Sequence, residues 1–310
     1  MNIYSIFDDF PIQACNILKE NGHNITLHPS GFPRPNSEQL KRILNSYDCI
    51  IIGTSQIITE EMFDDVVTSK IIATASIGVD HIHIPITKKG LITIINAPQS
   101  NAQSVAEFVF ACILLCQKRI LEGNNLYKSN KNKTFLSKKP QEISGKTIGL
   151  IGAGNISKNI MRIANVFNMN VIVYTKTPNK HKDFYALGAT FVNLETLCSS
   201  ADIISLALPY NDKTKGIINK DLIDNIKNDA VFISISRLGL IDFDALFKKT
   251  QEYSSFYACL DVDLDNHILS ENIDSFNLII TPHIAGGTEQ ARTRMFFDLS
   301  KQLIKVTEAF

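Results

Sequence analysis

The chain has no excess of charge of either sign and no long apolar segment. Its 31 lysines and arginines equal its 31 aspartates and glutamates in number, which argues against a nucleic acid or a membrane surface as the main partner. The longest apolar run, residues 108–116, is too short to span a bilayer. No lysine or arginine precedes Lys19, so the basic region that opens a secretory signal is missing. We therefore expect a soluble protein that remains inside the cell.

The chain also lacks any pair of cysteines in a CxxC arrangement. Its six cysteines are scattered, and most lie in apolar runs such as "FVFACILLC". This pattern is typical of reduced thiols in the core of a cytoplasmic protein. We expect neither a disulfide framework nor a metal site. The six are Cys15, Cys49, Cys112, Cys116, Cys198 and Cys259.

Short β-branched runs alternate with segments of helical period along almost all of the 310 residues. Strands that are apolar at nearly every position, each followed by a helix, indicate parallel sheets buried on both faces. The expected fold is α/β, with two doubly wound parallel-sheet domains. The first series of expected strands is 2–7, 25–29, 49–53 and 71–76, and the second is 146–152, 170–175, 202–208, 230–236, 256–262 and 277–282.

The domain boundary is placed at a turn that contains proline. The stretch "NAPQSNAQSVAEFVFACILLCQKRI" is typical of a turn followed by a long helix that begins near Ser100 or Asn101. Residues 101–286 are expected to form a Rossmann dinucleotide-binding domain. Residues 1–100 are expected to form a substrate domain, which the last segment, about 287–310, rejoins.

A glycine-rich turn supports the assignment of the second domain. In "KTIGLIGAGNISKNI", Gly152 and Gly154 come directly after an expected strand and before a helix. The first glycine permits a tight turn, and the second lets a pyrophosphate approach the helix N-terminus. The third position of the GxGxxG pattern is Ser157, which is still small. A plain strand-to-helix turn is the alternative, but the next strand at 170–175 favours a dinucleotide site.

The strand at 170–175 ends without the acidic residue that would hold the ribose of NAD. Thr175 and Lys176 occupy this point instead, and Lys180, His181 and Lys182 follow. A hydroxyl and an ammonium favour a 2′-phosphate, which a carboxylate would repel. We therefore expect NADP, with NAD as the possible alternative. A solvated loop with no role in binding would explain the lysines equally simply.

An ordered set of further motifs resembles the D-isomer-specific 2-hydroxyacid dehydrogenases. The motifs are "SIGVDHI" from residue 76, "SVAEF" from 104, "ALPYNDKTKGIIN" from 207, "SRLGLIDFDAL" from 236, "LDVDLDNH" from 260 and "TPHIAGGT" from 281. Members of this family reduce 2-keto acids with NAD(P)H or oxidise the corresponding D-hydroxy acids. The resemblance therefore implies a small-molecule substrate of this class, with no nucleic acid or membrane partner, and a homodimer.

Two side chains fit this chemistry on physical grounds. Arg237 follows an expected strand, and a guanidinium can hold a carboxylate through a two-pronged hydrogen bond. Reduction of a carbonyl leaves an alkoxide that needs a proton, which a histidine can donate near neutral pH. His283 also follows a strand and precedes Gly286 and Gly287. A surface ion pair for Arg237 and a helix cap for His283 are the alternatives. His81 and His83 are competing histidines, interpreted as structural.

The resemblance also implies roles for residues at the matching motif positions. The backbone of Ser76, Ile77 and Gly78 would bind the substrate carboxylate, and Asn155 and Ile156 would cover the pyrophosphate. The family's glutamate partner of the catalytic histidine corresponds here to Asn266, and Asp265 is the alternative. Leu208, Pro209 and Thr214 would line the adenosine side, and Ile235, Ser236 and Asp261 would lie near the nicotinamide.

The leading hypothesis is thus an NADP-preferring reductase of glyoxylate, hydroxypyruvate or a similar 2-keto acid. Oxidation of phosphoglycerate, erythronate phosphate or formate is an alternative within the family. A different class of function, a corepressor-like module that senses a nicotinamide cofactor with little turnover, is compatible with the same residues. The sequence does not determine the substrate's side chain.

Overall fold

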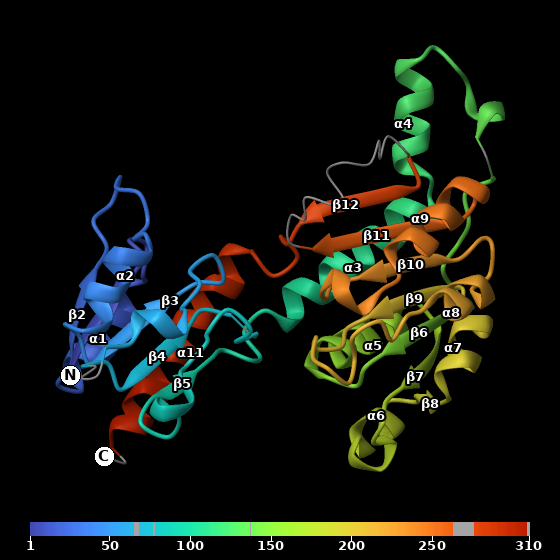
Figure 1. Cartoon of the computed structure of the whole chain (residues 1–310). Helices are drawn as coiled ribbons and strands as arrows, with labels where there is room; N and C mark the ends of the chain where they lie inside the picture. The colour runs from blue at the N-terminus through green and yellow to red at the C-terminus, as the bar shows by residue number, and fades with distance from the viewer. Residues whose placement is uncertain (65–67, 77, 137, 263–275, 309–310) are drawn as a thin grey trace. The chain divides into compact units, whose positions relative to one another are not determined.

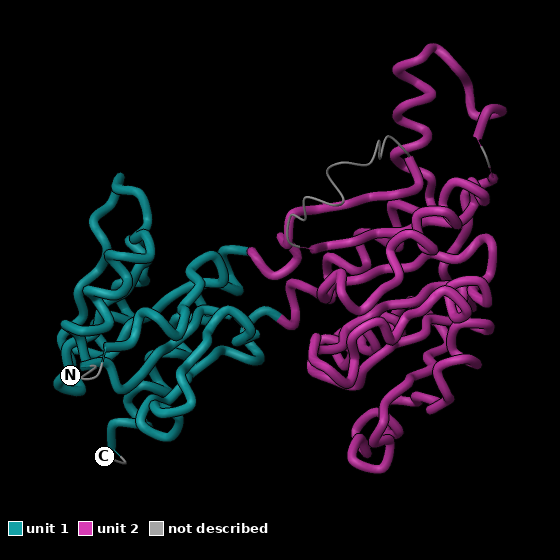
Figure 2. Tube along the Cα trace, viewed as in Figure 1, with its two compact units in different colours: residues 1–101, 288–310 teal, residues 102–287 magenta. Residues whose placement is uncertain are grey.

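A computed structural model of the chain describes residues 1–64, 68–76, 78–136, 138–262 and 276–308. These residues form two compact units, Met1–Asn101 with Thr288–Phe310, and Ala102–Gly287 (Figure 2). Each unit is built around a parallel sheet with helices on its faces. The expected α/β class with two doubly wound parallel-sheet domains is confirmed.

Unit 1 contains a five-stranded sheet of order β2-β1-β3-β4-β5, parallel throughout. The central strands β3 and β4 are buried at every position, which their apolar sequences make possible. The last helix returns to this unit: Phe296, Leu299 and Leu303 lie in its core, and Arg292 pairs with Asp9 at 2.6 Å. The elements are β1 Asn2–Ser5, α1 Ile12–Glu20, β2 Asn24–Leu27, α2 Ser37–Leu44, β3 Cys49–Ile52, η1 Glu60–Met62, β4 Ile71–Thr74, η2 Ile86–Lys88, β5 Thr93–Ile95 and α11 Glu289–Thr307.

Unit 2 contains a seven-stranded parallel sheet of order β12-β11-β10-β9-β6-β7-β8 (Figure 1). The strand order reverses between β6 and β9, and ligands of open α/β sheets bind at such a point, beyond the carboxyl ends of the strands. The strands are β6 Thr147–Ile151, β7 Asn170–Tyr174, β8 Thr190–Phe191, β9 Ile203–Leu206, β10 Val231–Ser234, β11 Tyr257–Val262 and β12 Leu278–Pro282.

Two hydrophobic cores cover the faces of this sheet. Helices α3, α5 and α6 contribute to one core, and α7, α8 and α9 contribute to the other. No helix in the described part of the chain is long and apolar enough to cross a membrane. The helices are α3 Ala102–Gln117, α4 Ile120–Lys128, η3 Lys133–Phe135, α5 Asn155–Val166, η4 Pro178–Lys180, α6 Lys182–Ala186, α7 Leu194–Ser200, α8 Lys220–Asn225, η5 Leu238–Leu240 and α9 Phe243–Glu252.

Candidate active site at the carboxyl edge of the sheet

The glycine turn joins β6 to α5, on the strand where the sheet order reverses. Gly152 has a φ of +108°, and a Cβ there would lie 2.7 Å from the carbonyl oxygen of Ala207. Only glycine therefore fits at this position without moving the backbone. A Cβ at Gly154 would meet no atom within 4 Å. Packing within the chain does not demand glycine at position 154, and the open space lies where a bound group could approach the helix.

The N-terminus of α5 is open to an anion. Gly154 is the N-cap and provides no side-chain cap, so the N–H groups of the first turn, at Asn155 and Ile156, lack an intrahelical acceptor. These N–H groups and the helix dipole favour negative charge. Ser157 is completely buried, as close packing between this helix and the sheet requires.

The end of β7 carries the residues that replace the acidic ribose ligand. Thr175 is half-buried, and its Oγ1 accepts a 3.4 Å hydrogen bond from the backbone N–H of Thr177. Lys176 is exposed, and its ammonium donates to the carbonyl of Lys213 at 3.3 Å. A hydroxyl and an ammonium thus lie at this strand end, which β6 adjoins directly.

The loop after β9 contains Leu208, Pro209 and Thr214. Thr214 is buried, and its hydroxyl donates to the carbonyl of Pro209 at 2.7 Å and accepts from the N–H of Asn211 at 3.0 Å. Thr214, whose side chain was expected to line the adenosine, is seen here to hydrogen-bond within its own loop. Leu208 is half-buried, and its Cδ2 would lie 3.1 Å from a Cβ at Gly152, so this loop adjoins the glycine turn.

The turn after β10 carries Ile235, Ser236 and Arg237. Ser236 is buried, and its hydroxyl donates to the carbonyl of Leu206 at 3.2 Å, which joins the ends of β10 and β9. Ile235 is half-buried and packs at the edge of a core. Arg237 is half-buried at the start of η5, three residues beyond the end of β10.

Asp261 on β11 binds the loop that carries His283. It is 2% exposed, and its carboxylate accepts hydrogen bonds from the Thr281 hydroxyl at 2.6 Å and from the N–H groups of Ile284 at 2.7 Å and Ala285 at 2.8 Å. His283 itself is half-buried and has a φ of +52°. This left-handed conformation costs a residue with a Cβ about 1–2 kcal/mol, and the bonds from Asp261 to the next two residues stabilise it.

Asp261 lies on β11, and Arg237 and His283 follow β10 and β12, the two strands that pair with β11 on its two sides. All three lie at the carboxyl edge of the sheet, at or beyond the last residues of the strands. Neighbouring strands are about 4.8 Å apart, so the strands that precede Arg237 and His283 are separated by about 10 Å.

In unit 1, a hydrogen-bonded turn follows β4. Thr74 Oγ1 lies 2.8 Å from Ser76 Oγ and 3.0 Å from His81 Nε2, and Ser76 Oγ donates to the carbonyl of Gly78 at 2.5 Å. His81 is buried in this network, which agrees with a structural interpretation of its side chain. Ile77 lies outside the described residues, as do Asp265 and Asn266, the two candidate partners of His283.

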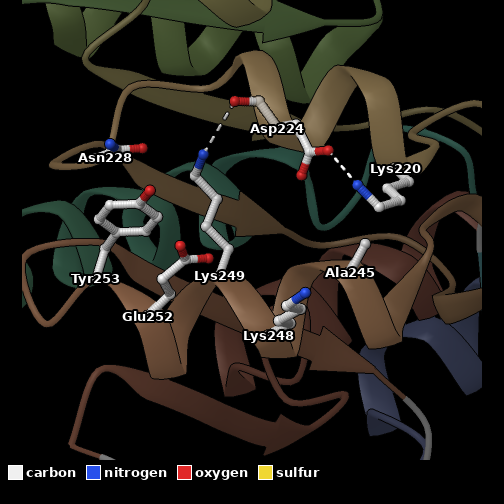
Figure 3. Close-up of a pocket in the computed structure, with 8 residues that line it drawn as sticks. All are labelled: Lys220, Asp224, Asn228, Ala245, Lys248, Lys249, Glu252 and Tyr253. Carbon is white, nitrogen blue, oxygen red and sulfur yellow. Dashed lines mark hydrogen bonds and ion pairs between the residues drawn. The ribbon is translucent and has the colours of Figure 1, made fainter.

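A hollow of about 300 Å³ lies elsewhere, between α8 and α9 (Figure 3). Lys249 is 5% exposed there and donates to the carbonyls of Ile226 at 2.7 Å and Asp224 at 3.4 Å. Burial lowers the pKa of Lys249, and Asp224 and Glu252 oppose this shift. Lys220 forms an ion pair with Asp224. The charged groups therefore stabilise the end of α8. No group of three or more metal-ligating side chains was found among the described residues.

Two residues at the carboxyl edge were not singled out by the sequence motifs. Thr281 binds Asp261, and Tyr210 covers Gly239, where a Cβ would lie 2.6 Å from the tyrosine Cε2. A hydroxyl residue in the last strand before "HIAGG" is a weak signal for Thr281. Tyr210 follows the "LP" motif directly, but no local pattern indicates that its ring contacts a different loop.

Comparison with known proteins agrees with this arrangement. The family model for the NAD binding domain of the D-isomer specific 2-hydroxyacid dehydrogenases matches residues 110–285 of this chain. A hydroxypyruvate reductase of Thermotoga maritima is 31% identical over 273 residues, which cover 86% of this chain and 87% of the relative. A D-3-phosphoglycerate dehydrogenase of Bacillus subtilis is also 31% identical, but the chain spans only 50% of its length.

Two solved structures extend the similarity to the whole chain. An acyclic imino acid reductase in complex with NADPH and D-Arg has a TM-score of 0.85 and 29% identity, with 100% of this chain and 98% of that chain covered. A D-lactate dehydrogenase from Aquifex aeolicus, complexed with NAD and lactic acid, has a TM-score of 0.77 and 27% identity, with 100% and 95% covered. The chain belongs to the D-isomer specific 2-hydroxyacid dehydrogenase family.

Proposed function

We propose that this protein is an NADPH-preferring reductase of small 2-keto acids, in which Arg237 binds the carboxylate and His283 supplies the proton. Membership of the family supports oxidoreduction of 2-hydroxy and 2-keto acids with a nicotinamide cofactor. The observation that carries the finer proposal is the placement of Arg237 and His283 after β10 and β12, on either side of the strand that carries Asp261. A small substrate with a carboxylate beside its carbonyl matches this spacing.

The residues at the glycine turn fit a dinucleotide. Open space at Gly154 and the uncapped first turn of α5 would accept the pyrophosphate. Leu208, Pro209 and Thr214 would border the adenosine, and Ile235, Ser236 and Asp261 would border the nicotinamide. The bound cofactor supplies the hydride that reduces the carbonyl.

The proposed preference for NADPH is based on the side chains of Thr175 and Lys176 at the end of β7. A 2′-phosphate would bind the ammonium of Lys176, which has only a carbonyl partner at 3.3 Å among the described contacts. The Thr175 hydroxyl would add a second donor. Charge-assisted hydrogen bonds of this kind are stronger than neutral ones, and NADH cannot form them.

Each side chain at the strand ends then has one task. Arg237 holds the substrate carboxylate and fixes the carbonyl for hydride transfer. His283 donates a proton to the developing alkoxide. Asp261 keeps the backbone around His283 in place. We also propose that residues 1–100 and about 287–310 form the substrate domain, in which, as the family resemblance implies, the backbone of Ser76, Ile77 and Gly78 would bind a substrate carboxylate.

A second candidate is the reduction of 2-imino acids. The observation that favours it is the similarity, over the whole chain, to an acyclic imino acid reductase bound to NADPH and D-Arg. A 2-keto acid and an amine condense to an imine with loss of water, and a protonated imine accepts hydride at carbon without a further proton. Replacement of His283 by Gln would therefore strongly lower ketone reduction and spare iminium reduction.

The deciding experiment is a panel of 2-keto acids, each assayed with NADPH and with NADH, in the presence and absence of ammonium or methylamine. Turnover with NADPH and no amine supports the ketone reductase. Turnover only with an amine supports the imine reductase. Binding of NADPH without turnover on any combination would support the cofactor-sensing module and overturn both.

The proposal includes a homodimer formed through unit 2. Helix α4 and the segment after it expose large apolar side chains, with Ile120, Tyr127 and Phe135 at 54%, 83% and 61% exposure. We propose that these exposed apolar side chains contribute to the interface. All six cysteines are buried free thiols, which supports the proposed cytoplasmic location. Light scattering of the purified chain tests the dimer.

A further inference from the structure

We propose that Tyr210 is a positioning residue for Arg237, and that it sets the grip on the substrate carboxylate through its contact with Gly239. This inference rests on the proposed function, because it concerns how Arg237 is held. Neither Tyr210 nor Gly239 belongs to the set of residues expected to touch substrate or cofactor. The argument depends on how the loop after β9 and the turn after β10 are joined.

The loop after β9 is held together by hydrogen bonds within the loop. Thr214 holds the carbonyl of Pro209 and the N–H of Asn211, and the Asn211 side chain accepts from the N–H of Lys213 at 3.0 Å. The N–H groups of Thr214 and Lys215 both donate to the carbonyl of Asn211 at 2.9 Å. Tyr210 therefore projects from a loop whose backbone is fixed by several internal hydrogen bonds.

This loop is hydrogen-bonded to the turn that carries Arg237. The N–H of Gly216 donates to the carbonyl of Gly239 at 2.9 Å, and the N–H of Ile218 donates to the carbonyl of Leu240 at 2.9 Å. Within the turn, the N–H of Leu240 donates to the carbonyl of Arg237 at 3.1 Å. A displacement of the loop would therefore be transmitted to the backbone of Arg237.

The ring of Tyr210 closes this connection. A Cβ on Gly239 would lie 2.6 Å from Cε2, 3.1 Å from Cζ and 3.3 Å from the hydroxyl oxygen of Tyr210, so the ring lies directly against the glycine. The backbone φ at Gly239 is not in the left-handed region, and the three atoms nearest to an added Cβ all belong to the Tyr210 side chain. Tyr210 is 42% exposed, so its role is not that of a core residue.

The test uses three single variants and one double-mutant cycle. Tyr210→Ala removes the ring, Tyr210→Phe keeps it, and Gly239→Ala displaces it. We expect Tyr210→Ala and Gly239→Ala to lower kcat/KM for the best 2-keto acid roughly 10- to 100-fold, mainly through KM, because a displaced clamp misplaces the substrate. Tyr210→Phe is expected to stay close to the wild type. In Tyr210→Ala/Gly239→Ala the added Cβ meets no ring, so the double variant is expected to match Tyr210→Ala within about twofold.

Two controls separate positioning from general damage. The Kd for NADPH and the thermal midpoint are expected to be unchanged in Tyr210→Ala. Tyr185→Ala removes a tyrosine that is 50% exposed on α6, and it is expected to keep wild-type kinetics. Where turnover is too slow to measure, the Kd of oxalate for the NADPH-loaded protein reports the binding of a carboxylate by Arg237. This Kd is expected to rise by the same factor as the KM of the 2-keto acid.

Several outcomes would overturn the inference. Wild-type KM in Tyr210→Ala, additive losses in the double variant, or an equal loss of NADPH affinity would each contradict it. If the wild type neither reduces any 2-keto acid nor binds oxalate, the proposed function fails, and the inference fails with it. If the wild type is active and Tyr210→Ala is unchanged, only this inference fails.

Discussion

The carboxylate of Asp261 accepts a 2.6 Å hydrogen bond from the hydroxyl of Thr281, across the pair of strands β11 and β12. The same carboxylate accepts from the backbone of Ile284 and Ala285, on the far side of His283. The hydrogen bonds of this one buried carboxylate therefore hold the chain both before and after His283, the residue proposed to donate the proton. This arrangement explains how a histidine is kept at a φ of +52°.

Asp261→Asn is the first prediction from this arrangement. An amide offers one acceptor oxygen and would turn its NH₂ group toward a backbone donor, so at least one of the three bonds is lost. We expect the free energy of unfolding to fall by roughly 1–3 kcal/mol and 2-keto acid turnover to fall at least about tenfold. Urea unfolding and steady-state kinetics check this.

Asp242→Asn is the matched control, because Asp242 caps α9 by accepting from the N–H of Ala245 at 3.0 Å and asparagine caps equally well. We expect wild-type stability and turnover in this variant. An Asp261→Asn variant that behaves like the control would show that the loop does not depend on this carboxylate.

The cofactor preference gives a second prediction. Lys176→Ala should lower kcat/KM with NADPH by roughly 10- to 100-fold, the equivalent of one lost charge-assisted hydrogen bond, and should leave the value with NADH nearly unchanged. Thr175→Asp should shift the preference toward NADH, because a carboxylate binds ribose hydroxyls and repels a 2′-phosphate. Lys248→Ala, which changes an exposed lysine of α9 in the same unit, is the control. Equal kcat/KM values of the wild type with both cofactors would refute the preference.

The substrate clamp gives a third prediction. Arg237→Lys should lower kcat/KM for the best 2-keto acid about 100-fold, although it keeps the charge, because one ammonium cannot reproduce the planar fork. Arg162→Lys changes an exposed arginine of α5 in the same unit and should have no effect. If Arg237→Lys stays within a few-fold of the wild type, Arg237 does not bind the carboxylate.

The fold could be predicted further than the site. Ten strands were expected because their sequences are apolar at almost every position, and each has a counterpart in the structure. The strands β5 and β8 were missed, since they are only three and two residues long and lie at sheet edges. The long helix expected after Asn101, in a stretch that ends at Ile120, is α3, whereas α4 was not expected. Arg119 lies between the two helices, where φ is +56°, and its buried guanidinium lies 4.8 Å from the ring centre of Tyr257. This contact joins residues 138 positions apart, so no local pattern indicates it.

The site was only partly accessible to sequence reasoning. The glycine turn after β6 could be recognised from the sequence, because the backbone conformation at Gly152 requires glycine at that position. The contacts of Asp261 with Ile284 and of Tyr210 with Gly239 join different loops. They depend on which strands become neighbours, and this follows from the sheet order and not from the motifs.

Asp202 gives a prediction about stability and pH. Its carboxylate accepts from the ammonium of Lys227 and from the N–H of Thr147, both at 2.8 Å. Partial burial raises the pKa of Asp202, but these two bonds outweigh burial and hold the pKa below its ordinary value. A carboxyl with a lowered folded-state pKa stabilises the protein above its unfolded pKa of about 3.9, and this contribution is lost as the pH falls through the folded pKa.

Asp202→Asn should therefore lower the free energy of unfolding by roughly 1–3 kcal/mol at neutral pH, and the difference from the wild type should shrink at acidic pH. Urea unfolding at a series of pH values measures this difference. Asp221→Asn, in the first turn of α8, is the control. A gap between wild type and Asp202→Asn that does not depend on pH would contradict the role of the charge.

The most direct test of the proposed ketone reductase is to measure NADPH binding and amine-free 2-keto acid reduction on the same His283→Gln variant. Glutamine keeps a polar side chain but cannot donate the catalytic proton. The account predicts a Kd for NADPH within about twofold of the wild type and a loss of turnover of roughly 100- to 10,000-fold. Turnover that survives at the wild-type level, with NADPH bound, would contradict the assignment of His283 as the proton donor and with it the proposed reaction.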